Sequence, residues 1–215
     1  MIRCCFFDLD GTLVDSLADI ADAMNWALAQ LGLPGYTLAE YSQKVGTGMD
    51  NLCRACLPAG REGDFTVLRQ LYDSRYSARC CEKTALYPGI ERSLQTLAAA
   101  GVTMAVLTNK PQSQADRVAE LLAPFGFARV MGKQEGFPIK PDPASLQHLM
   151  AELGAARENS VYVGDSDVDI RLGQNAGLPT VGVTWGFRGA AELWEAGADH
   201  LCTDPAALGA LILSL

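Results

Sequence analysis

The first residues of the chain form a short apolar run that ends in carboxylates. Residues 2–7 are mostly hydrophobic, and a run of this length predicts a buried strand. Asp8 and Asp10 follow it, and because residues two apart share one face of a strand, both carboxylates can point at one place. Two carboxylates this close need a cation to stay ionised, and a hard divalent ion such as Mg²⁺ takes such oxygen ligands. Gly11 allows the sharp turn that lets a substrate approach.

The next part of the chain has apolar positions at helical spacing. Ser16 followed by Asp19 predicts a capping box at the start of a helix, which Gly32 ends. Residues 37–83 continue as helical segments broken at glycine and proline, with no strong strand pattern. We therefore expect residues 16–83 to form an all-helical insertion.

The remainder of the chain alternates between strand and helix patterns. Strands are predicted at 102–108, 128–131, 161–164, 179–184 and 199–202, and helices at 91–101, 112–122, 142–154, 168–176, 190–196 and 205–214. This alternation predicts an α/β fold, a Rossmann-like, doubly wound parallel sheet with helices on both faces, built from residues 1–15 and 84–215. Ligands of such folds bind beyond the carboxyl ends of the strands.

Composition and charge narrow the classes of function. The 215 residues suffice for a real core, and the net charge of −8 argues against nucleic-acid or anionic-membrane binding. No apolar run approaches the length of a spanning helix, and the start of the chain lacks a signal-peptide pattern. We expect a cytoplasmic protein that is a monomer or homodimer.

The cysteines and histidines add no second chemistry. Seven cysteines, an odd number, favour reduced thiols over a disulfide framework. Cys53 and Cys56 have the spacing of a redox motif, but they lie in a helical pattern without a second pair, which favours ordinary core or surface cysteines. Two histidines are too few for a histidine-rich metal site.

Polar residues follow three of the predicted strands and one loop, in a fixed order. They are D-x-D-G-T at 8–12, Thr108 after a strand, Lys140 in K-P-x-P, and G-D-S-x-x-D at 164–169. In this order they resemble the four motifs of the haloacid dehalogenase superfamily, with a helical cap of the C1 type between the first two. The resemblance covers the whole chain. Within the superfamily, L-V-D-S, V-G-x-G, L-Y-P-G, T-N-K-P and T-W-G-F most resemble bacterial phosphoglycolate phosphatases.

The resemblance implies roles for the carboxylates. Asp8 would be the nucleophile that forms an aspartyl-phosphate, and Asp10 the acid and base that protonates the leaving group and then activates water. Mg²⁺ would be bound by the Asp8 carboxylate, the Asp10 backbone carbonyl and Asp165. An acid at position 10 favours phosphate chemistry over the carbon–halogen cleavage of other members.

Further residues would support these. Thr108 and the backbone N–H of Asn109 would bind phosphate oxygens, and Lys140 would neutralise Asp8 and the phosphoryl group. Ser166 and Asp169 would lie behind the metal site, with Asp169 orienting Lys140 or a bound water. An acid placed at the start of a helix to complement its dipole is an equal alternative for Asp169.

The insertion is expected to select the substrate. Lys44 and the turn Gly46-Thr47-Gly48 are the candidates for binding an anionic leaving group, since glycine-rich backbone can approach an anion closely. A plain helix–helix turn explains the same residues equally well. Arg75 and Arg79 come next, although their spacing is more typical of a solvated helix face.

Together these features predict a Mg²⁺-dependent phosphatase for a small anionic phosphomonoester, with 2-phosphoglycolate as the leading substrate. A sugar-phosphate phosphatase or a β-phosphoglucomutase-like enzyme would share all four motifs, so only the insertion separates these alternatives. A catalytically silent binding or regulatory protein is the third alternative, and the complete motif set speaks against it.

Overall fold

The computed structural model describes all residues, 1–215, and has a six-stranded parallel sheet at its centre. The sheet order is β5-β4-β1-β6-β7-β8. Its strands are β1 (Cys4–Phe7), β4 (Thr103–Pro111), β5 (Arg129–Lys133), β6 (Ser160–Gly164), β7 (Thr180–Val183) and β8 (His200–Cys202). The predicted α/β fold is confirmed, and every predicted strand is present within a few residues of its predicted ends.

The apolar run at the start of the chain is central in the sheet and buried on both faces. Cys5 and Phe7 face one cluster of the hydrophobic core, which the helices α5 (Ile90–Ala99), α6 (Gln112–Ala119) and α10 (Leu208–Ser214) cover. Cys4 and Phe6 face the opposite cluster, under α7 (Ala144–Glu152) and α8 (Asp167–Ala176). The helix α9 (Ala190–Glu195) packs near β7 and β8. A central parallel strand is therefore apolar at every position rather than at alternate ones.

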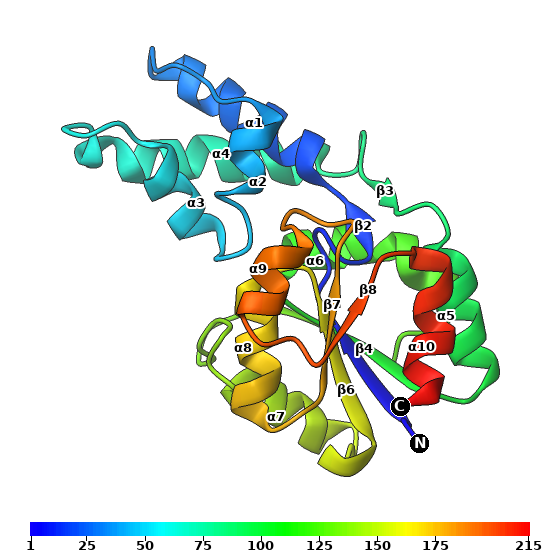
Figure 1. Cartoon of the computed structure of the whole chain (residues 1–215). Coiled ribbons are helices and arrows are strands. Elements are labelled where there is room, and N and C mark those ends of the chain that lie inside the picture. Colours follow the sequence, from blue (N-terminus) through cyan, green and yellow to red (C-terminus); the bar gives the residue numbers. More distant parts are fainter.

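The segment between β1 and α5 contains four helices that lie together at the carboxyl ends of the sheet strands (Figure 1). They are α1 (Leu17–Gln30), α2 (Leu38–Ser42), α3 (Met49–Cys56) and α4 (Phe65–Arg79). The helical character predicted for residues 16–83 is confirmed. Cys53 and Cys56 are buried in the core of this segment as free thiols, as the helical pattern predicted.

A two-stranded ribbon, which was not predicted, stands where the chain enters and leaves this helical segment. The strands β2 (Val14–Asp15) and β3 (Ala85–Leu86) pair antiparallel. Two residues per strand are too few to produce a periodic pattern, so the sequence carried no signal for them. The ribbon brings both connections to the helical segment side by side.

The predicted capping box at the start of α1 is wrong. Ser16 occupies the N-cap position, but its side chain makes no capping hydrogen bond; its Oγ donates to Asp10 Oδ1 over 2.6 Å. The buried Asp19 carboxylate instead accepts hydrogen bonds from the backbone N–H groups of Lys83 and Thr84 and from the Thr84 hydroxyl. Ser16 thus contacts the loop just before its helix, and Asp19 contacts a distant part of the chain, which helical spacing does not reveal.

The start of α7 is also shifted. The sequence placed Asp142 at the N-cap and Pro143 inside the helix, whereas α7 begins at Ala144 with Pro143 as its N-cap. Asp142 still accepts a hydrogen bond from the Ala144 backbone N–H, over 2.9 Å. The side chain therefore stabilises the turn that leads into the helix rather than the helix start itself.

Candidate active site

The candidate site lies where three neighbouring strands end. β4, β1 and β6 are adjacent and parallel, with Phe7 aligned to Val106 on one side and Val163 on the other. The residues that follow therefore arrive at one edge. Asp8 is one of them, and its backbone N–H donates to the Val163 carbonyl over 2.9 Å. Thr108 and Asp165 come from the flanking strands, as the sequence predicted.

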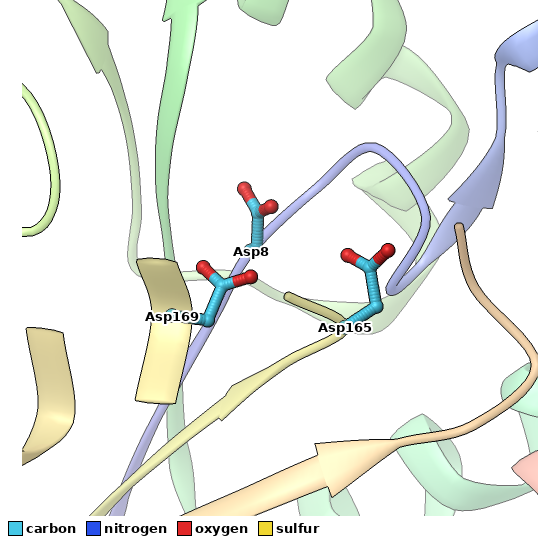
Figure 2. Close-up of side chains that lie close together, drawn as sticks. All are labelled: Asp8, Asp165 and Asp169. Atoms are coloured by element: carbon cyan, nitrogen blue, oxygen red, sulfur yellow. The ribbon is translucent and has the colours of Figure 1, made fainter. Parts of the chain in front are cut away.

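Asp8, Asp165 and Asp169 form a cluster of buried carboxylates. One oxygen of each lies within 4.8 Å of the others, and Figure 2 shows the three side chains gathered around the ends of β1 and β6. The Asp8 Oδ1 atom is buried, and its charged neighbour is the Lys140 Nζ atom, 2.9 Å away. Buried carboxylate oxygens gathered this closely suit a hard cation such as Mg²⁺, so these residues fit a metal ion of that kind.

Burial raises the pKa values of two carboxyl groups in this cluster, those of Asp8 and Asp165. It raises the pKa of Asp8 to about 6, because Lys140 offsets only part of the loss of water and the charges of Asp169 and Asp10 oppose ionisation further. Burial, with the charges of Asp169 and Asp8, also raises the pKa of Asp165 well above its usual range. A bound cation acts in the opposite direction and favours both carboxylates in their charged form.

Lys140 reaches the cluster from the loop between β5 and α7. Its Nζ atom lies 2.9 Å from Asp8 Oδ1 and 2.6 Å from Asp169 Oδ1, and it donates to the Tyr162 hydroxyl over 3.3 Å. Burial opposes the charged form, but Asp169 and Asp8 raise the pKa of Lys140 well above its usual range. The side chain is therefore an ammonium fixed beside Asp8.

Asp169 joins this lysine to the start of α8. While Oδ1 faces Lys140, Oδ2 accepts hydrogen bonds from the Ser166 backbone N–H over 3.1 Å and from the Ser166 hydroxyl over 2.6 Å. The two predicted roles of Asp169, which are to orient Lys140 and to provide an acid at the start of a helix, are thus compatible in one side chain. Gly164 is needed here, because a Cβ atom at that position would lie 2.2 Å from the Asp169 Cβ.

Asp165 is held by two other loops. Thr12 Oγ1 donates to its Oδ1 over 3.1 Å, and the Phe187 backbone N–H donates to Oδ2 over 2.8 Å. A Cβ atom at Gly186 would lie 2.3 Å from the Gly11 carbonyl oxygen, so only glycine lets these loops meet. The T-W-G-F segment contributed to the family resemblance, but nothing in the sequence showed that it contacts Asp165.

Asp10 has a strong partner that the sequence analysis did not assign. Lys110 Nζ lies 2.8 Å from both carboxylate oxygens of Asp10 and donates to the Tyr76 hydroxyl over 2.6 Å. Lys110 follows Thr108 and Asn109 at the end of β4, so the reasoning that singled out those two residues applied equally to it.

Asn109 connects β4 to two loops. Its Oδ1 accepts the Lys140 backbone N–H over 2.8 Å, and its Nδ2 donates to the Gly46 carbonyl over 3.1 Å. The side chain therefore fixes the Lys140 loop and the helical segment at once. The sequence assigned only the backbone of Asn109 to phosphate binding, and this contact is additional.

A cavity of about 50 Å³ opens between the sheet edge and the helical segment. The sheet side contributes Asp8, Asp10, Thr108, Asn109, Lys110, Pro111 and Gln114, and the helical segment contributes Ile20, Val45, Gly46, Gly48, Met49, Leu52 and Tyr72. One wall is therefore polar and charged, and the other is mostly apolar. This division suits a substrate with a phosphoryl group on one side and a small leaving group on the other.

The expected substrate residues of the helical segment divide into two groups. Gly46 and Gly48 line the cavity, but Lys44 and Thr47 do not. Lys44 Nζ donates to the Ala55 carbonyl over 2.9 Å and lies 4.7 Å from the centre of the Tyr36 ring. The expected approach of Lys44 to the substrate is therefore not what the structure shows, because its side chain is engaged on α3. Thr47 lines a separate hollow beside Lys140.

Arg75 and Arg79, the next candidates for substrate contact, also have other partners. Arg79 forms an exposed ion pair with Glu82, and Arg75 lies over the Trp26 ring. A different arginine, Arg188, extends from the sheet side and donates to the backbone carbonyls of residues 42, 43 and 45. It follows the T-W-G-F segment, and no pattern in the sequence indicates this contact.

Comparison with known proteins places the chain in a family. Residues 5–183 match the family model described as haloacid dehalogenase-like hydrolase. The chain is 38% identical to phosphoglycolate phosphatase from Yersinia pseudotuberculosis, covering 86% of this chain and 82% of that protein. It is 34% identical to phosphoglycolate phosphatase from Haemophilus influenzae, covering 94% of each.

Solved structures agree with this placement. The crystal structure of a protein from Lactobacillus delbrueckii subsp. bulgaricus superposes on this chain with a TM-score of 0.91 at 27% identity, covering 98% of each chain. The chain belongs to the haloacid dehalogenase-like hydrolase family. Within this family it is a phosphatase-like hydrolase. None of its helices is both long and apolar enough to cross a membrane.

Proposed function

We propose that the protein is a Mg²⁺-dependent phosphatase that hydrolyses a small anionic phosphomonoester, most directly 2-phosphoglycolate. The observation that carries this proposal is the Asp8 carboxylate. It lines the cavity, and the Lys140 ammonium lies 2.9 Å from its buried Oδ1. A carboxylate that opens on a cavity beside a fixed cation is arranged for attack on an anionic phosphoryl group.

The residues around Asp8 support a reaction in two steps. In the first, an Asp8 oxygen bonds to phosphorus, the bond from phosphorus to the leaving oxygen breaks, and Asp10 gives that oxygen a proton. In the second, water bonds to phosphorus and returns a proton to Asp10, while the Asp8–phosphorus bond breaks and inorganic phosphate leaves. Asp10 lines the same cavity as Asp8, so both side chains can reach one substrate.

The charge on the phosphoryl group is balanced by the chain and by a metal ion. Lys140 stands beside Asp8, and Thr108 lines the cavity with a hydroxyl that can bind a phosphoryl oxygen. Asp8, the backbone carbonyl of Asp10 and Asp165 are the proposed ligands of Mg²⁺, with Ser166 and Asp169 behind them. When bound, the ion neutralises phosphoryl charge and orients the group for in-line attack.

We further propose that residues 16–83 act as a cap domain on a core formed by residues 1–15 and 84–215. The helices of this segment lie at the carboxyl ends of the sheet strands (Figure 1), and they form the apolar wall of the cavity. Such a segment controls which leaving groups enter and how much water remains. The short β2–β3 ribbon contains both of its connections to the core.

The size of the cavity favours a small leaving group. A water molecule needs about 10–15 Å³ of such space, so the cavity of about 50 Å³ has room for only a few such volumes. A hexose is much larger and would require the helical segment to move outward. The relatives named phosphoglycolate phosphatase support the same substrate.

The test is phosphate release from three substrates, 2-phosphoglycolate, a hexose phosphate and a chromogenic aryl phosphate, each with and without Mg²⁺. We expect phosphate release to require Mg²⁺ for every substrate that is hydrolysed, and kcat/KM to be highest for 2-phosphoglycolate. Preference for the hexose phosphate, or its isomerisation without phosphate release, would overturn the substrate assignment. Release from none of the three would overturn the proposed activity.

A further inference from the structure

Lys110 is the only cationic residue among those that line the cavity. Lys140 contacts Asp8 but is not part of the cavity lining, and the Lys44 ammonium is engaged with the Ala55 carbonyl. An anionic leaving group that enters this space therefore meets the acidic side chains of Asp8 and Asp10 and a single ammonium group. Without that ammonium group, a second negative charge on the substrate would be repelled.

The Lys110 ammonium is fixed from both sides of the cavity. Asp10, on the sheet side, lies 2.8 Å away through both oxygens, and Tyr76, on α4, accepts a hydrogen bond over 2.6 Å. The side chain is 4% exposed. The Tyr76 ring stacks on Tyr72, with ring centres 5.5 Å apart, and Tyr72 lines the cavity. The position of this charge is thus set by packing rather than by solvent.

The contact with Asp10 places Lys110 close to the leaving oxygen. In the proposed reaction Asp10 gives its proton to that oxygen, so the two are in hydrogen-bond contact. Lys110 is hydrogen bonded to the same carboxylate. In 2-phosphoglycolate the carboxylate is attached to the carbon that carries the leaving oxygen. Asp10 contacts the leaving oxygen and is itself hydrogen bonded to Lys110. A carboxylate on the carbon next to that oxygen therefore lies within reach of the Lys110 ammonium group.

Asp10 can share Lys110 without losing its own position. Ser16 Oγ donates to Asp10 Oδ1 over 2.6 Å, and Tyr76 holds the ammonium independently of Asp10. One N–H of Lys110 can therefore turn from Asp10 to the substrate while the acid stays in place. We propose that Lys110 binds the substrate carboxylate when that carboxylate is attached to the carbon that carries the leaving oxygen, and that Lys110 thereby determines specificity. This inference rests on the phosphatase activity proposed above.

The test compares two phosphate esters of similar size, 2-phosphoglycolate and isobutyl phosphate, which has an uncharged isopropyl group in place of the carboxylate. Lys110→Met should lower kcat/KM for 2-phosphoglycolate by roughly 10- to 100-fold, the effect of one charge-assisted contact. Any loss through Asp10 affects both substrates alike, so kcat/KM for isobutyl phosphate should fall by a smaller factor, and the ratio of the two kcat/KM values should fall at least about fivefold. Lys133→Met is the matched control, because it removes an exposed lysine that pairs with Asp50 outside this cavity, and it should alter neither value.

Two other outcomes of this comparison would each overturn the specificity assignment. Equal losses for both substrates would show that Lys110 acts only by positioning Asp10, and would overturn the specificity assignment. Unchanged values for both would overturn it as well. Thermal unfolding of each variant shows whether the fold is intact. If Lys110→Met does not fold, Lys110→Gln takes its place, since it also removes the charge, and the same fall in the ratio of the two kcat/KM values is expected.

A measurement on the unmodified protein tests the inference independently of folding. The phosphate ester of 3-hydroxypropanoate carries its carboxylate one carbon further from the leaving oxygen. We expect kcat/KM to fall at least about tenfold from 2-phosphoglycolate to this longer ester, and equal values would contradict the role of Lys110. Absence of hydrolysis of every ester and of an aryl phosphate would instead refute the proposed activity.

Discussion

Lys140 forms a shorter ion pair with Asp169 than with Asp8. The Nζ–Oδ1 distance is 2.6 Å to Asp169 and 2.9 Å to Asp8. Asp169 is fully buried and is itself fixed by hydrogen bonds from Ser166. The lysine is thus positioned mainly by a residue that does not line the cavity, and Asp8 receives a cation whose place is already determined.

Replacing Asp169 should therefore reduce activity without removing any residue that touches the substrate. We expect Asp169→Asn to lower kcat for 2-phosphoglycolate roughly 10- to 100-fold, the usual effect of losing a supporting partner. Asp167→Asn is the control, since Asp167 pairs with the exposed Arg171 on the same helix and should change kcat less than about twofold. Steady-state kinetics on both variants decide this, and equal behaviour would refute the positioning role.

The buried carboxylate of Asp19 should stabilise the fold more than an exposed one nearby. Asp19→Asn weakens a set of hydrogen bonds to the Lys83 and Thr84 backbone, which should lower the free energy of unfolding by roughly 1.5–3 kcal/mol. Asp22 pairs with Lys83 on the surface, and Asp22→Asn should cost less than about 1 kcal/mol. Urea denaturation measures both values, and a similar loss for the two would contradict this account.

The turn at residues 46–48 and Lys44 should respond differently to substitution. Gly46 lines the cavity, has φ of +116° and accepts a hydrogen bond from Asn109. Gly46→Val should therefore lower kcat/KM for 2-phosphoglycolate roughly 10- to 100-fold. Lys44→Ala should change it less than about threefold, because the lysine is directed to Ala55. The reverse order of effects would restore Lys44 as a substrate residue.

Removal of divalent cations should abolish turnover. The buried carboxylate cluster of Asp8, Asp165 and Asp169 has oxygen donors only, so Mg²⁺ should restore activity after chelation. Ca²⁺ should inhibit, because it prefers longer bonds and more ligands than Mg²⁺ and would disturb in-line geometry. Phosphate release is measured after exhaustive chelation and after each metal is added back. Full activity of the chelated protein would contradict the metal role.

The sheet and the convergence of the main site residues could be predicted from the sequence. Strand ends in a parallel sheet meet at one edge, so Asp8, Thr108 and Asp165 could be placed together from their order alone. Lys140 was found because it stands in a motif between strands. These predictions depend on local patterns and on one general rule of the fold, which is why they could be made without coordinates.

Contacts between distant loops could not be predicted. The Asp10–Lys110 and Arg188–Ser42 contacts join residues far apart in the chain, and no spacing or periodicity connects them. The same holds for Asp19, whose local pattern indicated a helix cap while its actual partners are residues 83 and 84. The direction of the Lys44 side chain could not be predicted for a related reason, since a lysine beside a glycine turn does not show in which direction its side chain points.

The central claim is that Asp8 attacks phosphorus, and replacing it with the isosteric asparagine tests this most directly. The measurement is kcat/KM for 2-phosphoglycolate with saturating Mg²⁺, on Asp8→Asn protein whose thermal unfolding shows an intact fold. Loss of a sole covalent nucleophile predicts a decrease of at least ~10³-fold. Activity within about tenfold of the unmodified protein would contradict the assignment.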